Sequence, residues 1–347
     1  MALQPSRQGV LILSGLLVTL VSITLFRDAQ TRTARESESA FVSLIEDDSI
    51  KEQSVSRVEV VLPGGEITWN YARVEGLWRL PEFAGAFALN EEVDNLVKML
   101  LQGRARPVAS GPTEEARHGL LPGDRITLSL FQGDKRIVRL FVGALAPGAA
   151  KDERYVHKNG DDTVYLLTSN PAVFFEQVEP PALLDRHILP RALPHGMPNL
   201  ITFSGSRPHQ LRELTIKRLP VDPKEEERLS KDKNAKRQPT HEFIGTLVSG
   251  DSKTFDDTDG MTYVNALLNI EFDKIVGSIS PVQIEYRKFD EPVIDIILTY
   301  DKDNSINLSV SGTLIEGKYP ILNKATGQMF VVSSEKVDSL IPTLKAK

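Results

Sequence analysis

The chain has 347 residues, a net charge of −6 at pH 7 and no cysteine. Its length exceeds what one compact core usually holds, so we expect two domains after any membrane segment. The mild acidity argues against nucleic-acid binding, which depends on strong basic patches. The lack of cysteine excludes disulfides and thiolate metal sites but leaves the compartment undecided.

The first predicted element is the uncharged run GVLILSGLLVTLVSITLF at residues 9–26. As a helix it would cover about 27 Å, close to the roughly 30 Å hydrocarbon core of a bilayer. A cleaved signal peptide is the alternative, but the run is longer than a usual signal core. Arg27 and Asp28 also follow it directly, where a small-residue cleavage site would be needed. We therefore predict a cytoplasmic tail and transmembrane helix over residues 1–26.

Within this helix, Gly15, Thr19 and Ser22 fall on one face. Small residues let a neighbouring membrane helix approach closely, so this face is our candidate helix interface. Alternatively, Thr19 and Ser22 only bond their own backbone. Arginines after the run outnumber Arg7 before it, which on a simple count favours keeping the following chain inside the cell. The count is weak evidence, because long domains cross largely regardless of flanking charge.

Residues 27–54 are mostly polar and charged, and we predict that they form a juxtamembrane stalk. A first α+β repeat is expected over residues 55–190. Runs rich in Val, Ile, Trp and Tyr predict strands, and apolar residues at helical spacing predict a helix that Asn90 caps and Gly103 ends. The expected strands are 57–62, 66–74, 76–80, 125–132, 136–143, 153–158 and 163–168, with a short helical segment at 171–177.

A second α+β repeat is expected over residues 191–347, with the same order of elements. The segment RYVHKNGDDTVYLLTS resembles KYPILNKATGQMFVVSS, so that Tyr155 matches Tyr319 and Gly143 matches Gly312. This similarity predicts duplication of a whole unit of antiparallel sheet with packed helices. The expected strands are 211–218, 241–249, 282–289, 292–300, 305–312, 318–322 and 327–333, and the helices are 260–272 and 334–344.

A charged insertion at residues 219–240 breaks the symmetry of the repeats. We place it between the first two strands of the second repeat, where the first repeat has only the turn at residues 63–65. Its lack of large apolar residues predicts a solvated hairpin insertion. A partner-docking or headgroup-contacting arm is the functional alternative, because Lys and Arg cluster at residues 228–237.

Catalytic motifs are lacking in the sequence, which has no nucleophile elbow and no glycine-rich phosphate loop. His187 and His195 are the nearest approach to a metal-binding pair, yet they lack zinc-site spacing. Asp301, Asp303 and Ser305 resemble the first ligands of a calcium loop, but we predict that they form a hairpin turn. We predict that Asp256, Asp257 and Asp259 lie at the start of a helix and do not bind a metal. We predict no catalytic residue, metal or cofactor, and hence no enzyme.

Trp69 and Trp78 lie on neighbouring predicted strands and are the candidate surface-binding residues. Two exposed aromatic rings there could stack on a sugar, whereas strand aromatics more commonly belong to the core. The two interpretations differ in whether the rings are exposed.

The segments GLWRL, HGLLP, the strand ending in FVG and the YV and VYLL pair together resemble the bacterial family of domain of unknown function 4340. The matching residues are Trp78, Gly119, Leu120, Gly143, Tyr155, Val164 and Tyr165. Leu121-Pro122 follows Gly-Leu one residue earlier than the family pattern. The likeness covers residues 55–178 and, more faintly, residues 211–344.

The resemblance implies a cell-envelope protein whose relatives tend to be encoded beside gliding-motility-type ABC transporters, with the folded part outside the inner membrane. We therefore expect a non-catalytic, membrane-anchored, periplasmic accessory or scaffold subunit. Its partners would be a permease and an ATPase, with residues 9–26 packed against the permease. An envelope glycan- or lipid-binding module that uses Trp69 and Trp78 is the alternative. A membrane-anchored hydrolase would need an acid, base or metal that the sequence does not offer.

Overall fold

The computed structural model describes residues 41–45, 50–147, 153–175, 181–193, 196–220, 240–278, 280, 284, 287–301 and 304–342. By contacts the chain divides into two compact units, one formed by residues 1–69 and 94–178 and the other by residues 70–93 and 179–347. The predicted membrane helix lies outside the described residues. Within the described part, no helix is long and apolar enough to cross a bilayer.

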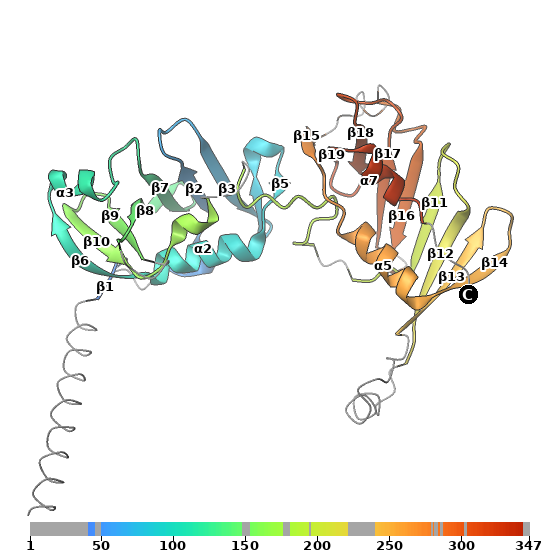
Figure 1. Cartoon of the computed structure of the whole chain (residues 1–347), viewed down its shortest axis with the longest axis horizontal. Helices are drawn as coiled ribbons and strands as arrows, with labels where there is room; N and C mark the ends of the chain where they lie inside the picture. The colour runs from blue at the N-terminus through green and yellow to red at the C-terminus, as the bar shows by residue number, and fades with distance from the viewer. Residues whose placement is uncertain are drawn as a thin grey trace, which may run out of the picture. The chain divides into compact units, whose positions relative to one another are not determined.

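The first sheet has ten strands in the order β1-β6-β10-β9-β8-β7-β2-β3-β4-β5, and each strand pairing resolved within it is antiparallel (Figure 1). Its strands are β1 (Val42–Ser43), β2 (Arg57–Val61), β3 (Thr68–Val74), β4 (Leu77–Leu80), β5 (Ala86–Phe87), β6 (Arg104–Ser110), β7 (Ile126–Gln132), β8 (Lys135–Leu145), β9 (Arg154–Lys158) and β10 (Thr163–Leu167). The helical elements along this part are η1 (Glu52–Ser54), η2 (Pro81–Phe83), α2 (Asn90–Gln102), α3 (Pro112–Arg117) and η3 (Pro171–Phe174).

Alternation along the strands places one face of this sheet in the core. In β2, Val58 and Val60 are buried while the other three residues of the strand are partly exposed, and β4 repeats the alternation with Trp78 and Leu80 buried. Helix α2 buries the predicted apolar stripe, which includes Val93, Leu96, Val97 and Leu100. The core of the first sheet therefore follows from the sequence pattern.

Asn90 does not serve as the expected helix cap. Its side-chain oxygen accepts a hydrogen bond from the backbone N–H of Trp78 at 2.8 Å, and its amide donates to the carbonyl of Ala88 at 2.9 Å. The side chain thus ties the start of α2 to β4. The end of the helix is as expected, since α2 stops at Gln102, directly before Gly103.

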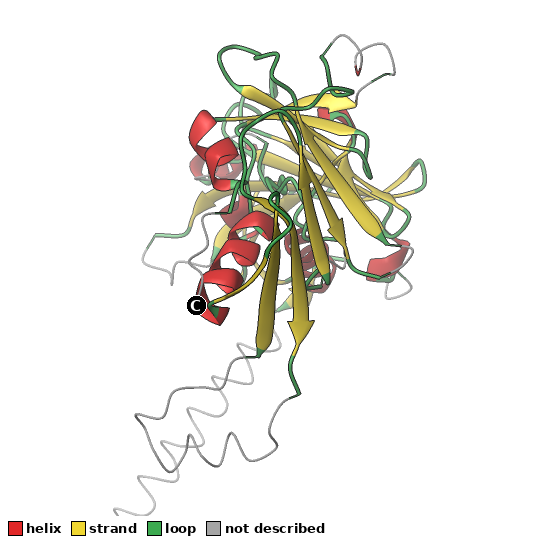
Figure 2. Cartoon of the chain, turned by 90° about the vertical axis from the view of Figure 1, so that its right-hand side faces the viewer, coloured by secondary structure: helices red, strands yellow, loops and turns green. Residues whose placement is uncertain are grey.

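The second sheet has nine strands in the order β14-β13-β12-β11-β16-β17-β18-β19-β15, and its pairings are antiparallel as well. Figure 2 shows α5 beside these strands. The strands are β11 (Leu200–Ser204), β12 (Leu211–Arg218), β13 (His241–Leu247), β14 (Ser252–Phe255), β15 (Lys274–Ser278), β16 (Ile294–Thr299), β17 (Ser305–Val310), β18 (Tyr319–Asn323) and β19 (Gln328–Val332). The helices are α5 (Asp257–Leu268) and α7 (Ser334–Ser339).

Read from β15 to β14, the second sheet has the same strand order as the first sheet read from β6 to β5. In each, four strands precede a helix, a fifth strand follows it, and four more form a meander. The fifth strand pairs with the last strand of the meander, as β6 does with β10 and β15 with β19. This shared topology supports the duplication expected from the sequence, and the fold is α+β. The boundary at residues 190 and 191 stays a prediction.

Six strands were not expected from the sequence, namely β1, β5, β6, β11, β14 and β15. The strand expected over residues 282–289 is wrong, because Ile284 is helical and residues 287–290 form a turn and a bend. The missed β11 also shifts the position of the charged insertion. This insertion joins β12 to β13, so its counterpart in the first repeat is the β3–β4 turn at Glu75 and Gly76, and not the turn at residues 63–65.

Candidate functional site

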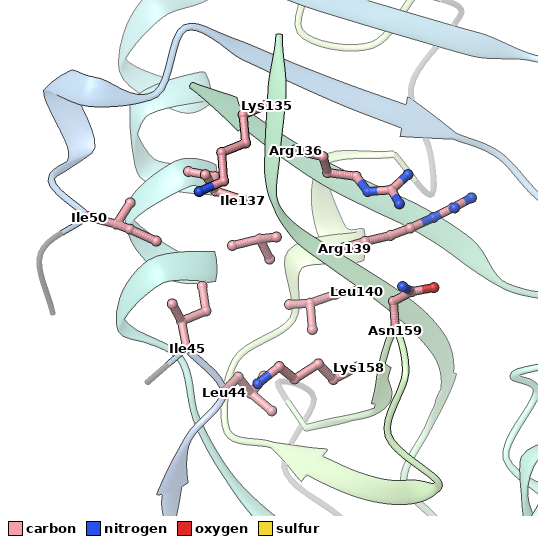
Figure 3. Close-up of a pocket in the computed structure, with 11 residues that line it drawn as sticks. Leu44, Ile45, Ile50, Lys135, Arg136, Ile137, Arg139, Leu140, Lys158 and Asn159 are labelled. Carbon is pink, nitrogen blue, oxygen red and sulfur yellow. The ribbon is translucent and has the colours of Figure 1, made fainter. Parts of the chain in front are cut away.

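A cavity of about 430 Å³ opens beside β8 in the first unit (Figure 3). One wall is the first half of β8 and the end of β9, and the other is formed by residues that precede β2 in the chain. Its lining consists of Leu44, Ile45, Ile50, Lys135, Arg136, Ile137, Val138, Arg139, Leu140, Lys158 and Asn159. The volume falls in the range of small-molecule sites.

The lining is apolar at its base. Leu44, Val138 and Leu140 are 2%, 7% and 1% exposed, so they belong to the core. Ile45 and Ile137 are half-buried and keep part of their surface open to the cavity. An apolar group placed in the cavity would therefore remove hydrocarbon surface from water, worth about 25 cal/mol per Å².

Two lysine amines lie at the border of this apolar base. Figure 3 shows the amines of Lys135 and Lys158 reaching toward the cavity from β8 and β9, while Arg136 and Arg139 point away from Ile45. None of the described lining residues is acidic. The cavity thus combines hydrocarbon with positive charge, an arrangement that suits an anionic amphiphile.

The residues that carry the family resemblance meet a short distance away. The carbonyl of His118 accepts a hydrogen bond from the backbone N–H of Ala144 at 2.8 Å, which holds the His-Gly-Leu turn against β8. A Cβ on Gly143 would overlap the carbonyl oxygen of His118 and lie 3.0 Å from Cγ of Leu120. Gly143 therefore has to lack a side chain for this turn to pack.

Around this turn, Leu120 packs with Phe141 and Val164 in a buried cluster that Tyr155 adjoins. The rings of Tyr155 and His118 lie 4.0 Å apart, edge to face. Desolvation on burial lowers the pKa of His118, against the opposing effect of Glu114. The residues around this turn that carry the family resemblance therefore serve packing, and none of them is among the described residues that line the cavity beside β8.

A second polar group lies at the β9–β10 turn. The carboxylate of Asp161 accepts hydrogen bonds from the hydroxyl of Tyr165 at 2.7 Å and the backbone N–H of Thr163 at 2.9 Å. The bond from Tyr165 is the main reason that the pKa of Asp161 lies below its ordinary value. His157 contacts the carbonyl of Asp161 through Nε2, and its Nδ1 lies 3.6 Å from Glu115. These contacts close the turn.

In the second unit, Asp185 and His187 form a buried pair with 2.6 Å between Oδ1 and Nδ1. Such a pair is part of a catalytic triad when a hydroxyl or thiol faces the other ring nitrogen. Here the group opposite Nε2 is the carboxylate of Glu271, at 3.8 Å. Asp185 also accepts hydrogen bonds from the backbone N–H groups of His187 at 3.1 Å and Arg191 at 2.7 Å, so its role is to fold this segment.

This segment is fixed by hydrogen bonds within the second unit. The hydroxyl of Tyr71 donates to the carbonyl of Ala182 at 2.6 Å, and the N–H of Ile188 donates to the carbonyl of Ile270 at 3.0 Å. Because these bonds hold both ends of the segment, we assign the Asp185–His187 pair to structure.

The interpretation of Trp69 and Trp78 as a surface platform is wrong. Trp69 is 3% exposed and packs against Phe175, with ring centroids 6.2 Å apart, and Trp78 is fully buried with the guanidinium of Arg73 at 4.5 Å from its ring. Both rings are buried in the hydrophobic core, so neither presents a face on which a sugar could stack. The core interpretation is confirmed.

The remaining predicted residues fall into two groups. Gly15, Thr19, Ser22, His195 and Asp303 lie outside the described residues. Asp256 begins α5 as expected, since its carboxylate accepts the N–H of Thr258 at 2.9 Å. Asp301 and Ser305 belong to the predicted β16–β17 hairpin, closed by the N–H of Tyr300 bonding the carbonyl of Asn304 at 3.0 Å. Within the described ranges, no three His, Asp or Glu side chains are grouped to hold a metal ion.

The cavity beside β8 was not predicted from the sequence. Lys135 and Arg136 follow a hairpin turn, and Lys158 precedes another, so each reads as an ordinary turn residue. Their closeness to Ile45 depends on strand pairing across the sheet, which local patterns do not reveal. The one local signal was the isolated apolar group at residues 41–45 in a polar stretch.

The comparisons with known proteins give one match. A family model described as "Domain of unknown function (DUF4340)" matches residues 78–292, more than half of the chain. The matched region begins at Trp78 and includes the His118 turn and β8. No curated protein and no solved structure matches this chain.

Proposed function

Because the chain belongs to the family of domain of unknown function 4340, we propose that it is a non-catalytic, membrane-anchored accessory or scaffold subunit of a gliding-motility-type ABC transporter complex. Residues 9–26 would be the anchor in the bacterial inner membrane, and the bulk of the chain would lie in the periplasm. A permease and an ATPase would be its partners, and the ATPase would hydrolyse ATP.

The observation that carries this proposal is the use of the family residues for packing. Gly143, Leu120 and Tyr155 hold a turn against a strand, and the Asp185–His187 pair faces a carboxylate where a triad would have its nucleophile. Residues so used favour a rigid platform over an active site. The transporter association itself rests on the family resemblance.

The proposal is tested by affinity purification of the full-length chain in mild detergent from its native cells. We expect a permease and an ATPase in stoichiometric amounts. Replacing Gly15, Thr19 and Ser22 with leucine should reduce permease recovery severalfold, because bulky side chains keep helices apart. The matched control replaces Leu13, Leu17 and Leu20, on the opposite helix face, with alanine and should keep the partners. Isolation of the wild-type chain alone would contradict the proposal.

The alternative, an envelope-binding module, loses its tryptophan site through the burial of Trp69 and Trp78. Lipid binding has separate support from the cavity beside β8.

A further inference from the structure

We propose that the cavity beside β8 binds an anionic acyl lipid, with its phosphate or carboxylate head at Lys135 or Lys158 and its chain along Ile45 and Ile137. The site lies in the first unit and is distinct from the candidate helix interface. It does not depend on the transporter proposal.

The charge of the lining determines the sign of the head group. The amines of Lys135 and Lys158 reach toward the cavity, and no described lining residue carries a carboxylate. The chain as a whole has a net charge of −6, so this local excess of positive charge runs against the composition. Lys135 makes no ion pair with another described residue, and its amine remains available to an anion in the cavity.

The apolar base determines the rest of the ligand. A small inorganic anion would leave Ile45, Ile50 and Ile137 exposed to water beside it. An acyl chain would cover them and remove that hydrocarbon surface from water. The lining therefore favours an amphiphile over a free phosphate.

An acidic peptide is the other anionic ligand to consider, and the length of the open edge of β8 argues against it. β8 pairs with β7 from Lys135 onward, whereas its pairing with β9 begins only at Leu140. Among the described strands, none covers this edge over residues 135–138, and so short a stretch offers few of the backbone hydrogen bonds that give an added peptide strand its affinity. Recognition at this site therefore rests mainly on side chains, as it does for a lipid.

Glu46, Asp47 and Asp48 fall between the lining residues Ile45 and Ile50 in the sequence and outside the described residues. Their charge would oppose an anionic ligand wherever they lie near it. The variant Glu46→Gln, Asp47→Asn, Asp48→Asn should therefore bind the lipid at least as tightly as wild type. Loss of binding in this variant would overturn the proposal.

The main test measures binding of phosphatidylglycerol and phosphatidylcholine with identical acyl chains to the full-length chain in neutral detergent, by native mass spectrometry. We expect phosphatidylglycerol to bind at least tenfold more tightly. The double variant Lys135→Ser, Lys158→Ser should lose about tenfold in affinity for phosphatidylglycerol. The double variant Lys98→Ser, Lys253→Ser, which removes two exposed lysines elsewhere, should bind as wild type.

Further arms separate the parts of the ligand and its source. Ile45→Ser should weaken phosphatidylglycerol binding severalfold and leave glycerol phosphate unaffected. Binding of monomeric lysophosphatidylglycerol would identify a carried lipid, and binding only to phosphatidylglycerol nanodiscs would identify a membrane-surface contact. Equal binding by wild type and the Lys135→Ser, Lys158→Ser variant, with both folded by circular dichroism, would overturn the proposal. So would an acidic peptide that binds through these lysines when the lipid does not.

Discussion

At Gly143, β8 passes so close to the His118 turn that only a hydrogen atom fits. A methyl group there would meet the carbonyl oxygen of His118 and the side chain of Leu120. The carbonyl is held by its bond to Ala144 and Leu120 is fully buried, so neither can move freely. The site therefore has no room to relax.

We predict that Gly143→Ala destabilises the protein by about 1–3 kcal/mol, the usual cost of overpacking a core. Urea unfolding of the full chain in mild detergent, followed by circular dichroism, measures the change. The matched control is Gly123→Ala, where a new Cβ meets nothing within 4 Å, and it should be neutral or slightly stabilising. Equal stability of the two variants would contradict this prediction, because it would mean that the His118 turn moves to make room for the methyl group.

The residue-scale predictions from sequence differ in quality for a physical reason. The place of Asp256 at a helix start depends only on residues close to it in the chain and was predicted correctly. The contact of Gly143 with His118 joins segments that are far apart in the chain, so spacing alone could not reveal it. The burial of Trp69 likewise depends on Phe175, which belongs to another element.

At the scale of elements, α5 is placed by one close contact with the second sheet. Gly260 faces β13, and a Cβ at this position would enter the ring of Phe243, which is fully buried. Alanine favours a helix over glycine by about 1 kcal/mol, so propensity and packing oppose each other here.

We predict that packing wins and that Gly260→Ala destabilises the protein by about 1 kcal/mol net, measured by thermal unfolding. Adding Phe243→Leu should make the loss less than the sum of the two single changes, because the smaller side chain relieves the overlap. The control Thr262→Ala changes an exposed position in the same helix and should shift stability by only a few tenths of a kcal/mol. A stabilised Gly260→Ala protein would contradict this view of α5.

Most helices and strands with a clear hydrophobic periodicity of their own were predicted from the sequence. Strands that exist mainly because a neighbouring strand pairs with them were missed. β6 contains Pro107 and three exposed residues in a row, so it lacks the alternation of a half-buried strand. β14 is a short edge strand with a single buried residue. β11 is different, because Ile201 and Phe203 alternate clearly and the signal was overlooked.

At the scale of the whole molecule, the shared strand order of the two sheets supports the duplication that sequence similarity predicted. The similarity was visible because both copies keep the meander that ends in β10 or β19. It placed the insertion one hairpin too early, since β11 had been missed. The fold class was thus predictable from the sequence, whereas the strand-by-strand correspondence between the two copies required the structure.

The proposed topology gives a prediction for the whole chain. Because the protein has no cysteine, Val248→Cys introduces a unique thiol at a position that is 59% exposed. We expect a membrane-impermeant maleimide to label it in spheroplasts. Ser6→Cys, on the other side of residues 9–26, should react only after lysis. The reverse pattern would place the folded part in the cytoplasm.

The second copy closes the β12–β13 hairpin with residues 219–240, whereas the first closes its counterpart with Glu75 and Gly76. The β12–β13 ladder nevertheless stays paired up to Arg218 and His241, and the N–H of Leu219 still bonds the carbonyl of Thr240 at 2.9 Å. By loop-closure entropy, lengthening a turn about tenfold costs only about 2 kcal/mol. An affinity tag or reporter can therefore be inserted at the tip of this hairpin without changing the strand pairing of either sheet.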